Sequence, residues 1–287
     1  MAVFDIQIYL KERKSLVDRA LDRYLKGSEK YPQALHRAMH YGVFPGGKRL
    51  RPILVLAAGE LFGERHGLLL PFACALELIH AYSIIHDDLP ALDNDDLRRG
   101  VPANHKMFGE GIALLAGDAL LTEAFHLMSR PQVARGLKPK TALEVMHEIA
   151  RAAGAGGMVG GQAVDLEAEG READIATVEY IHVRKTGALI QVAARVGAKI
   201  GGANAKALRR ISRYGDFLGL AFQIADDILD AAGQDGGKAT YPSVVGPAAS
   251  RARVQELLRH CLKEIELFGK NADPLRGIAR SIGERVL

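Results

Sequence analysis

The stretch of sequence that decides the fold is LLLPFACALELIHAYSIIHDDLPALD, residues 68–93. Its first part, residues 68–85, is almost entirely apolar and leads directly into a dense group of acids. That group comprises Asp87, Asp88, Asp93, Asp95 and Asp96. Carboxylates held so close repel one another, and burial raises the free-energy cost further. The sequence therefore predicts a largely buried helix that ends at a site completed by positive charge.

The apolar run has the character of a core helix rather than of a membrane span. Pro71, Glu77 and His80 interrupt it, whereas a spanning helix needs about 20 consecutive apolar residues. Residues 1–21 mix acids with bases and lack the apolar core of a signal peptide. We therefore expect a cytoplasmic protein without a membrane span.

The composition is that of an ordinary globular protein. Of the 287 residues, 48% are hydrophobic and 25% are charged, and the formal net charge is +4. Lys and Arg residues are spread along the chain, so the charge pattern does not demand a nucleic-acid partner, and none is expected. Cys74 and Cys261 lie far apart in apolar surroundings. They predict two buried thiols instead of a disulfide, and they exclude a cysteine metal site.

Helical periodicity runs through most of the chain, and strand signals are nearly absent. Apolar residues recur at helical spacing in several segments, for example Ile53, Ala57 and Leu61. Loops rich in Gly and Pro separate these segments, and no linker or repeat divides the chain. The pattern predicts an all-α fold, with residues 1–287 forming one domain of roughly ten helices.

A second acidic cluster lies in FQIADDILD, residues 222–230. Asp226 and Asp230 are four residues apart, so they share one face of the expected helix, and Gln223 falls on the same stripe. Taken alone, this cluster is equally well a solvated acidic face.

The two clusters together indicate a metal site. Oxygen ligands suit a hard cation such as magnesium, which usually takes one or two carboxylates and completes its shell with water and phosphate oxygens. Calcium storage is a competing interpretation, but no EF-hand loop spacing is present. The pattern therefore favours several divalent ions that bridge carboxylates to a diphosphate.

Two basic pairs accompany the clusters. Lys48 and Arg51 follow a Gly-rich turn at i and i+3, and Arg98 and Arg99 follow the first cluster at once. Each pair is suited to an anion. Two carboxylate clusters and two basic sets together predict a pair of substrates rich in phosphate.

Two further residues have weaker signals. Lys185, which precedes Thr186 in HVRKTG, lies on an apolar helix face, where a lysine usually extends its amine to solvent. His80 lies two turns before the first acidic cluster, and alone it would be interpreted as a core histidine. Both gain weight only from the surrounding motifs.

These motifs resemble those of the trans-isoprenyl diphosphate synthases, over about residues 30–285. DDLPALD followed by NDDLRRG is similar to the first aspartate-rich motif of the family in its bacterial form, and DDILD is similar to the second. GGKRLRP, GDALL, GGQAVDL, KTGAL and KATYP match in order. Within the family the chain is most similar to bacterial farnesyl diphosphate synthases (geranyltranstransferases). The resemblance implies an all-α bundle, usually a homodimer, with both aspartate motifs facing a central active-site cavity.

The resemblance also implies a role for each candidate residue. The magnesium ligands would be Asp87, Asp88, Asp93, Asp226 and Asp230. The allylic diphosphate would be bound by Arg98, Lys185 and Lys238, and isopentenyl diphosphate by Lys48, Arg51, His80 and Arg99. The catalytic set would be Lys185, Thr186, Gln223, Asp87 and Asp226, with Thr186 and Gln223 beside the reacting carbons. Tyr82 and Ser83 would form the floor that stops chain growth.

The implied reaction is the head-to-tail condensation of isopentenyl diphosphate with dimethylallyl or geranyl diphosphate, which gives farnesyl diphosphate and diphosphate. About three magnesium ions, which manganese can replace, would stabilise charge on the leaving diphosphate. Synthesis of geranylgeranyl or geranyl diphosphate is the nearest alternative. A class I terpene cyclase would not need the second basic set, a regulatory subunit would not need both aspartate motifs, and a helical scaffold would need neither basic set.

One segment departs from the family pattern. Only seven residues, AAGQDGG, separate Asp230 from Lys238, where the family has a longer lid. Either the lid is shortened here or part of it is missing from the sequence.

Overall fold

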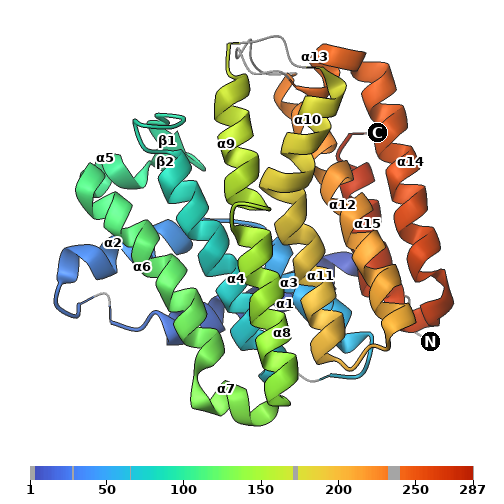
Figure 1. The fold of residues 1–287 in the computed structure, drawn as a ribbon, viewed down its shortest axis with the longest axis horizontal. Helices are drawn as coiled ribbons and strands as arrows, with labels where there is room; N and C mark the ends of the chain where they lie inside the picture. The colour runs from blue at the N-terminus through green and yellow to red at the C-terminus, as the bar shows by residue number, and fades with distance from the viewer. Residues whose placement is uncertain (1–3, 28, 65, 171–173, 232–239, 287) are drawn as a thin grey trace.

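Helix α4 (His66–Asp87) runs through the middle of a helical bundle and ends at the first acidic cluster (Figure 1). This is a computed structural model, which describes residues 4–27, 29–64, 66–170, 174–231 and 240–286. Phe72, Leu76 and Ile79 of α4 are completely buried. The apolar run therefore forms the predicted core helix because helices pack against it on several sides.

Helices make up nearly all of the regular structure, as predicted. The other α-helices are α1 (Ile6–Tyr24), α2 (Gln33–Val43), α3 (Leu50–Glu60), α5 (Asn104–Phe108), α6 (Glu110–Ser129), α7 (Pro131–Gly136), α8 (Pro139–Ala153), α9 (Met158–Ala168), α10 (Ile175–Ile181), α11 (Ala188–Ile200), α12 (Ala205–Ala231), α13 (Tyr241–Val245), α14 (Pro247–Ile265) and α15 (Asp273–Gly283). A π-helix, η1 (His182–Gly187), joins α10 to α11, and a 3₁₀-helix, η2 (Glu266–Ala272), joins α14 to α15. Within the described residues, eleven helices have at least eleven residues, close to the predicted ten.

Two short strands were not predicted. β1 (Leu97–Arg98) and β2 (Val101–Pro102) pair antiparallel, with Leu97 opposite Pro102. Gly100 between them has a φ of +78°, which glycine adopts without steric cost. Strands of two residues are too short to show an alternating pattern in the sequence.

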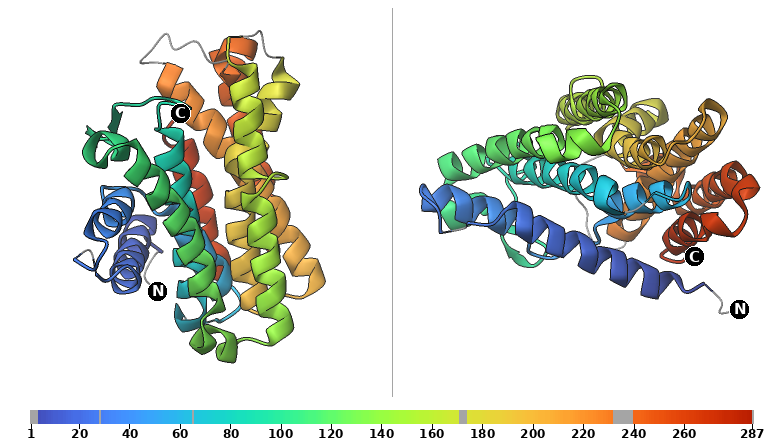
Figure 2. Two further views of the ribbon diagram at one scale, coloured as in Figure 1. Left: turned by 60° about the vertical axis from the view of Figure 1, so that its left-hand side comes forward. Right: turned by 90° about the horizontal axis from the view of Figure 1, so that it is seen from below.

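The helices pack as a chain of neighbours. α6 packs on α4, α4 on α3, α3 on α11, α11 on α12, and α12 on α14. Figure 2 shows α1 lying along one side of this arrangement. The side chain of Asp5 caps α1 by accepting hydrogen bonds from the backbone N–H groups of Gln7 and Ile8.

The π-helix η1 is held between α9 and α12 by glycines. A Cβ atom at Gly161 of α9 would lie 2.2 Å from the backbone nitrogen of Lys185, and one at Gly219 of α12 would lie 2.7 Å from the Cα of Gly187. Only glycine allows backbones to approach so closely. This contact fixes the segment that carries Lys185 and Thr186.

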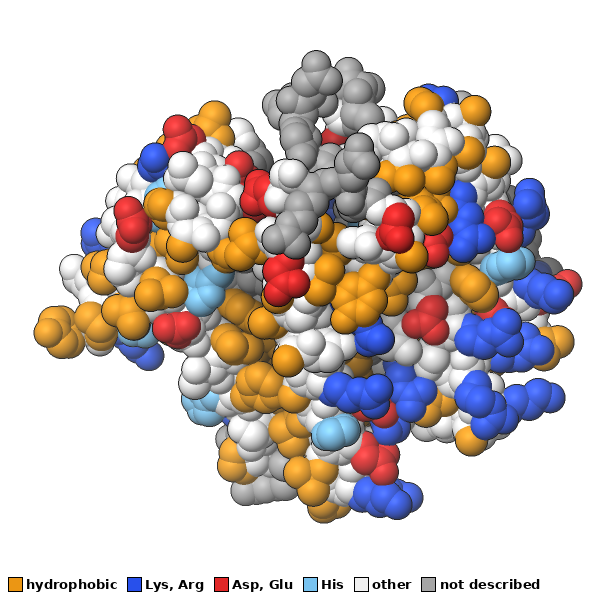
Figure 3. Space-filling model, turned by 45° about the horizontal axis from the view of Figure 1, so that its top comes forward, with side chains coloured by type: hydrophobic (Ala, Val, Ile, Leu, Met, Phe, Trp, Pro, Cys, Tyr) orange, Lys and Arg blue, Asp and Glu red, His pale blue; other side chains and the backbone are white. Residues whose placement is uncertain are grey.

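The predicted thiols and core helix are found. Cys74 and Cys261 are free and buried. Both α4 and α6 are long and apolar enough to cross a membrane, but 78% of the most apolar window of α4 is buried inside the bundle, against 39% for α6. Hydrophobic side chains reach the surface on the left of Figure 3, the side on which α6 lies, whereas Lys and Arg gather at its lower right.

Candidate active site

A cavity of about 520 Å³ lies where α3, α4, α9, η1 and α12 meet. Ten of the predicted site residues line it: Arg51, His80, Tyr82, Ser83, Asp87, Asp93, Arg98, Lys185, Thr186 and Gln223. The predicted residues outside this lining are Lys48, Asp88, Arg99, Asp226 and Asp230. Lys238, and the segment expected to form the lid, lie outside the described residues.

The chain after α4 folds back so that the acids of the first cluster converge. The backbone N–H of Asp93 donates a hydrogen bond of 2.8 Å to the carbonyl of Asp87. Burial raises the pKa of Asp87 to about 6; the Lys185 ammonium opposes this shift, and the Asp93 carboxylate adds to it. Burial likewise raises the pKa of Asp88 to about 6, although Arg98 opposes it. The cluster is therefore short of positive charge.

This shortage fits a divalent cation. Among the described residues, the buried Oδ1 of Asp88 has no hydrogen-bond partner, and Arg98 approaches it only to 3.6 Å. Carboxylate oxygens are the ligands that magnesium prefers. Among the described residues, no group of three or more His, Cys, Asp and Glu side chains is already gathered into a metal site. The carboxylates would therefore share ions with oxygen atoms of a bound ligand.

The second cluster borders the same cavity. Gln223, one turn before Asp226 on α12, lines it, and the Asp226 carboxylate acts electrostatically on Arg51. Burial raises the pKa of Asp226, while Arg285 and Lys48 oppose the shift. Asp230 is exposed. The two predicted acids of this cluster thus differ in burial: Asp226 is half-buried, whereas Asp230, one turn later near the end of α12, is exposed.

The middle acid of DDILD has a different function. Asp227 accepts hydrogen bonds from the backbone N–H of Tyr241 at 2.8 Å and from Nε2 of Gln223 at 3.2 Å. Nε2 of His182, on η1, lies 3.2 Å from Oδ2 of Asp227, the same oxygen that accepts from Tyr241. Asp227 therefore ties η1, α12 and α13 together and orients Gln223, a role that sequence analysis did not assign.

A group of cations faces the acids. Burial lowers the pKa of Arg51 to about 10, and its Nε has no hydrogen-bond partner in the described part of the chain. Burial, together with Arg51, Arg99 and Arg98, keeps the pKa of His80 well below its usual range. His80 is therefore neutral near pH 7. Cations crowded in this way, with donors unpaired, fit an anion.

The Gly-rich turn before α3 contacts this cationic group. Gly46 and Gly47 have φ values of +72° and +100°, and a Cβ atom at Gly47 would lie 3.1 Å from Nη1 of Arg99. Arg99 donates to the carbonyl of Pro45 at 3.2 Å. Lys48, which follows the turn, is exposed. Because Gly46 and Gly47 have no side chains, the backbone of the turn is open beside Arg99, and a phosphate group can approach it there.

Arg49 anchors this turn and was passed over in the sequence. Its φ is +53°, which points it inward between Lys48 and Arg51. It donates to Glu77 at 2.7 Å and to Asp18 at 2.8 Å, and its side chain is 2% exposed. Arg49 is therefore structural, because its side chain is paired with buried Glu77 and half-buried Asp18.

Two residues of GGQAVDL also belong to the site. Nζ of Lys185 donates to Oδ2 of Asp165 at 2.7 Å. Gln162 lines the cavity, and its Oε1 is buried without a hydrogen-bond partner in the described structure. In the sequence, the only signal for Gln162 and Asp165 was that GGQAVDL matches a family motif. The resemblance gave neither residue a role of its own.

Tyr82 and Ser83 lie in the cavity wall about one turn before the acids. Tyr82 is 7% exposed, and its ring meets the ring of His86 edge-on, with centroids 5.7 Å apart. The hydroxyl of Ser83 donates to the carbonyl of His80 at 2.9 Å. The pair therefore borders the space that begins at Asp87.

Comparison with known proteins gives consistent matches. Residues 32–241 match the family model described as polyprenyl synthetase. The chain is 45% identical over 285 residues to a farnesyl diphosphate synthase of Geobacillus stearothermophilus, covering 95% of this chain and 94% of that protein. It is 41% identical to geranylgeranyl pyrophosphate synthase 4 of Arabidopsis thaliana, covering 98% and 78%. A solved FPP/GFPP synthase from Zymomonas mobilis superposes with a TM-score of 0.90 at 40% identity, covering 97% and 98%.

Proposed function

The chain belongs to the polyprenyl synthetase family and is a prenyltransferase, and from that premise we propose that its main product is farnesyl diphosphate. Isopentenyl diphosphate would be joined head to tail first to dimethylallyl diphosphate and then to geranyl diphosphate. The observation that carries this proposal is the 520 Å³ cavity, which has carboxylates at one end, cations beside them and Tyr82 in its wall. Residues 1–287 would act as one domain, since one cluster of buried residues extends from Tyr9 to Val286.

The metal ions belong to the two acidic clusters. Members of this family generally depend on divalent metal. The ligands would be Asp87, Asp88 and Asp93 from the first cluster and Asp226 and Asp230 from the second. Magnesium, about three ions, or manganese in its place, supplies Lewis-acid stabilisation of a leaving diphosphate when bound. The raised pKa values and the unpaired oxygen of Asp88 support this assignment.

The allylic diphosphate is bound by cations near the first cluster. Lys185, held by Asp165 at 2.7 Å, and Arg98 both line the cavity. They stabilise the negative charge that develops on the diphosphate as the allylic C–O bond breaks, and no reorganisation is needed at that moment. Lys238 remains a predicted member of this set.

Isopentenyl diphosphate is bound by the other basic set. Arg51, with its unpaired Nε, provides charge, and Arg99 and Lys48 extend it along the glycine turn. Neutral His80 adds a hydrogen bond without repelling the arginines. Binding here holds the double bond of isopentenyl diphosphate against the allylic carbon. The two reacting groups therefore do not have to meet by diffusion in solution.

Two uncharged residues border the reacting carbons. Thr186 and Gln223 line the cavity beside Lys185. Asp227 accepts a hydrogen bond from Nε2 of Gln223. This contact fixes the orientation of the Gln223 amide and thereby the direction of its oxygen. The released diphosphate is the expected acceptor of the proton lost when the new double bond forms.

One assay tests this function. The purified chain is incubated with isopentenyl diphosphate, dimethylallyl diphosphate and magnesium, and products are separated by chromatography. Farnesyl diphosphate is expected. Geranylgeranyl or geranyl diphosphate as the main product would replace the chain-length assignment, whereas a hydrocarbon formed without isopentenyl diphosphate would indicate a cyclase. Absence of any condensation product with magnesium or manganese would overturn the proposal.

A second copy of this chain is the proposed partner. Leu114 and Leu115 of α6 are 46% and 53% exposed, although α6 is among the most apolar helices, and such a face favours a homodimer. Light scattering should give the dimer mass. Leu115→Glu should yield monomer, and the matched variant Leu267→Glu, at a leucine that is 68% exposed on η2, should not. The cytoplasmic location stays a prediction.

A further inference from the structure

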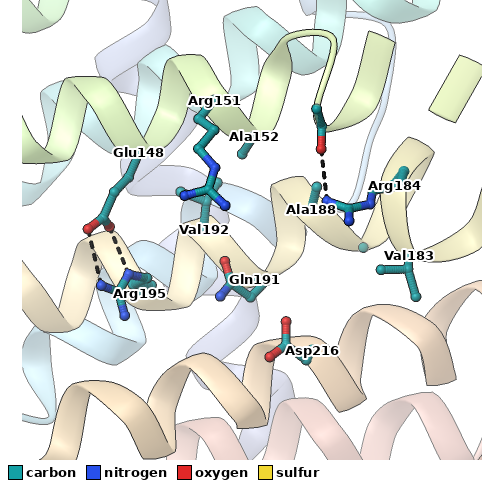
Figure 4. A pocket seen from close by; sticks show the side chains of 12 residues that line it. Glu148, Arg151, Ala152, Val183, Arg184, Ala188, Gln191, Val192, Arg195 and Asp216 are labelled. Atoms are coloured by element: carbon teal, nitrogen blue, oxygen red, sulfur yellow. Dashed lines mark hydrogen bonds and ion pairs between the residues drawn. The ribbon is translucent and has the colours of Figure 1, made fainter. Parts of the chain in front are cut away.

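Two cavities flank η1, and only one of them adjoins the acidic clusters. The second cavity, of about 450 Å³, lies between α8, η1, α11 and α12, where Arg195 donates to Glu148 at 2.9 Å (Figure 4). Its lining shares no residue with that of the active-site cavity. A hydrocarbon chain that grows from a diphosphate beside Asp87 is therefore limited by the walls of the active-site cavity.

His86 forms part of the wall between the active-site cavity and α6. It lines this cavity one turn after Tyr82 and directly before Asp87. Leu114 and Gly117 of α6 meet its imidazole, and neither of them lines the cavity. The imidazole therefore lies between the cavity and α6.

A hydrogen bond holds this ring on α6. Nε2 of His86 lies 2.9 Å from the carbonyl oxygen of Leu114. Because a carbonyl only accepts, Nε2 is the protonated nitrogen and the donor. Oδ1 of Asp118 lies 3.9 Å from the same nitrogen, which is beyond hydrogen-bond distance. The contact that fixes the ring is therefore the one to the backbone of α6.

Gly117 makes room for the ring on α6. A Cβ atom at Gly117 would collide with Nε2 and Cδ2 of His86. Gly111, on the same helix, has open space where its Cβ atom would lie. Gly117 is therefore required for the contact between His86 and Leu114, because a larger residue would push the imidazole away from α6.

The His86 ring in turn holds the ring of Tyr82. The two rings meet at an interplanar angle of 80°, with centroids 5.7 Å apart, an edge-to-face arrangement that aromatic pairs favour. No hydrogen bond between described residues holds the Tyr82 hydroxyl, so packing places this side chain. The position of the Tyr82 ring therefore depends on the position of the His86 ring.

We propose that His86 is a positioning residue for product length, which holds Tyr82 in the cavity wall through its hydrogen bond to α6. This inference rests on the proposed prenyl transfer and deepens it, because it makes α6 a part of the device that limits chain growth. Without the His86 ring, the Tyr82 ring can turn aside, and the cavity then admits a longer hydrocarbon chain.

Product chromatography of His86 variants, with isopentenyl diphosphate, dimethylallyl diphosphate and magnesium, tests the proposal. His86→Ala should raise the ratio of geranylgeranyl to farnesyl diphosphate by about tenfold, because an aromatic contact and a hydrogen bond are lost. His86→Gln should restore most of the original ratio, since its amide nitrogen reaches the same carbonyl. His86→Asn, which is one methylene shorter, should behave like His86→Ala. His126→Ala, at an exposed histidine on α6, is the control and should leave the ratio unchanged.

Gly117→Ala tests the same contact from α6. It should change the product ratio of the unaltered chain, because the added methyl group displaces the imidazole, and it should have no effect in His86→Ala, where no ring is left to displace. Gly111→Ala should leave the ratio unchanged in both backgrounds.

Three outcomes would overturn the role of His86: an unchanged ratio in His86→Ala, equal ratios in His86→Gln and His86→Ala, or the same effect of Gly117→Ala in both backgrounds. Failure of the unaltered chain to form any condensation product would instead overturn the proposed function.

Discussion

The guanidinium of Arg285 donates a hydrogen bond of 2.6 Å to the carboxylate of Asp226. It also lies over the ring of Phe222, 5.5 Å from its centroid, so the contact joins the end of the described chain to α12. Asp226 is the principal predicted metal ligand of the second cluster. A metal ion that binds this carboxylate would therefore compete with Arg285 for its negative charge.

Arg285→Ala should lower the magnesium concentration that gives half-maximal activity. The expected change is about two- to fivefold, the range for a partly exposed ion pair. Turnover is measured at a series of magnesium concentrations with saturating substrates. Arg280→Ala, at an exposed arginine one turn earlier on α15, should leave the value unchanged. An unaltered or higher requirement in Arg285→Ala would show that the ion pair does not compete with metal.

Asp87→Ala should reduce turnover by about 10²–10³-fold or more, because an ion that stabilises the leaving group loses a ligand. Asp96→Ala provides the control within the same stretch, since Asp96 forms an exposed ion pair with Lys106 at 2.7 Å. Excess chelator should abolish activity, and magnesium or manganese should restore it. Full activity in chelator contradicts the assigned metal site.

The pKa of Asp87 predicts how stability varies with pH in the metal-free protein. Its value is raised to about 6 by burial, so the folded state binds a proton more tightly than the unfolded state. The stability contributed by this group is complete below its unfolded value near 4 and is lost as pH rises through about 6.

Asp87→Asn should therefore stabilise the metal-free protein at pH 8 by about 1–2 kcal/mol. The gain should vanish below about pH 4, where the carboxyl is protonated in both states. Urea unfolding at several pH values measures the difference. Added magnesium should reverse the order at pH 8. A gain that is independent of pH would mean that Asn acts through packing instead.

Arg51→Ala and Lys185→Ala should affect different substrates. Loss of Arg51 should raise the KM for isopentenyl diphosphate by about tenfold or more, whereas loss of Lys185 should mainly impair use of the allylic diphosphate. Steady-state kinetics with each substrate varied in turn separates the two effects. Identical defects toward both substrates would show that the two anion sites are wrongly divided.

Product length should respond to Tyr82 and Ser83. Ser83→Phe should shift the product toward geranyl diphosphate, because the added ring fills the cavity close to Asp87. Tyr82→Ala should shift it toward geranylgeranyl diphosphate by removing buried bulk. Tyr31→Ala, at a tyrosine that is 94% exposed, should leave the product unchanged. If chromatography gives the same chain length for all three variants, a neighbouring helix sets the limit.

The sequence by itself determined the helical class and the chemistry of the clusters. The apolar periodicity of residues 68–85 and the four-residue spacing of Asp226 and Asp230 are local properties. Helix geometry converts such spacing into faces without reference to the rest of the fold. The family resemblance implied that Tyr82 and Ser83 border the growing chain, and both line the cavity.

Only the tertiary structure decided which charged groups pair. Arg49 is buried and structural, whereas Arg51 lines the cavity. Sequence spacing does not distinguish the two, because the left-handed φ at Arg49 decides in which direction each side chain points. Arg285 meets Asp226, and Asp165 meets Lys185, across long stretches of chain. Those contacts depend on how helices pack, and the packing of η1 depends on Gly161 of α9 and Gly219 of α12, which let its backbone approach. Local spacing carries no information about such approaches, so the second cavity beside η1 also appears only in the folded chain.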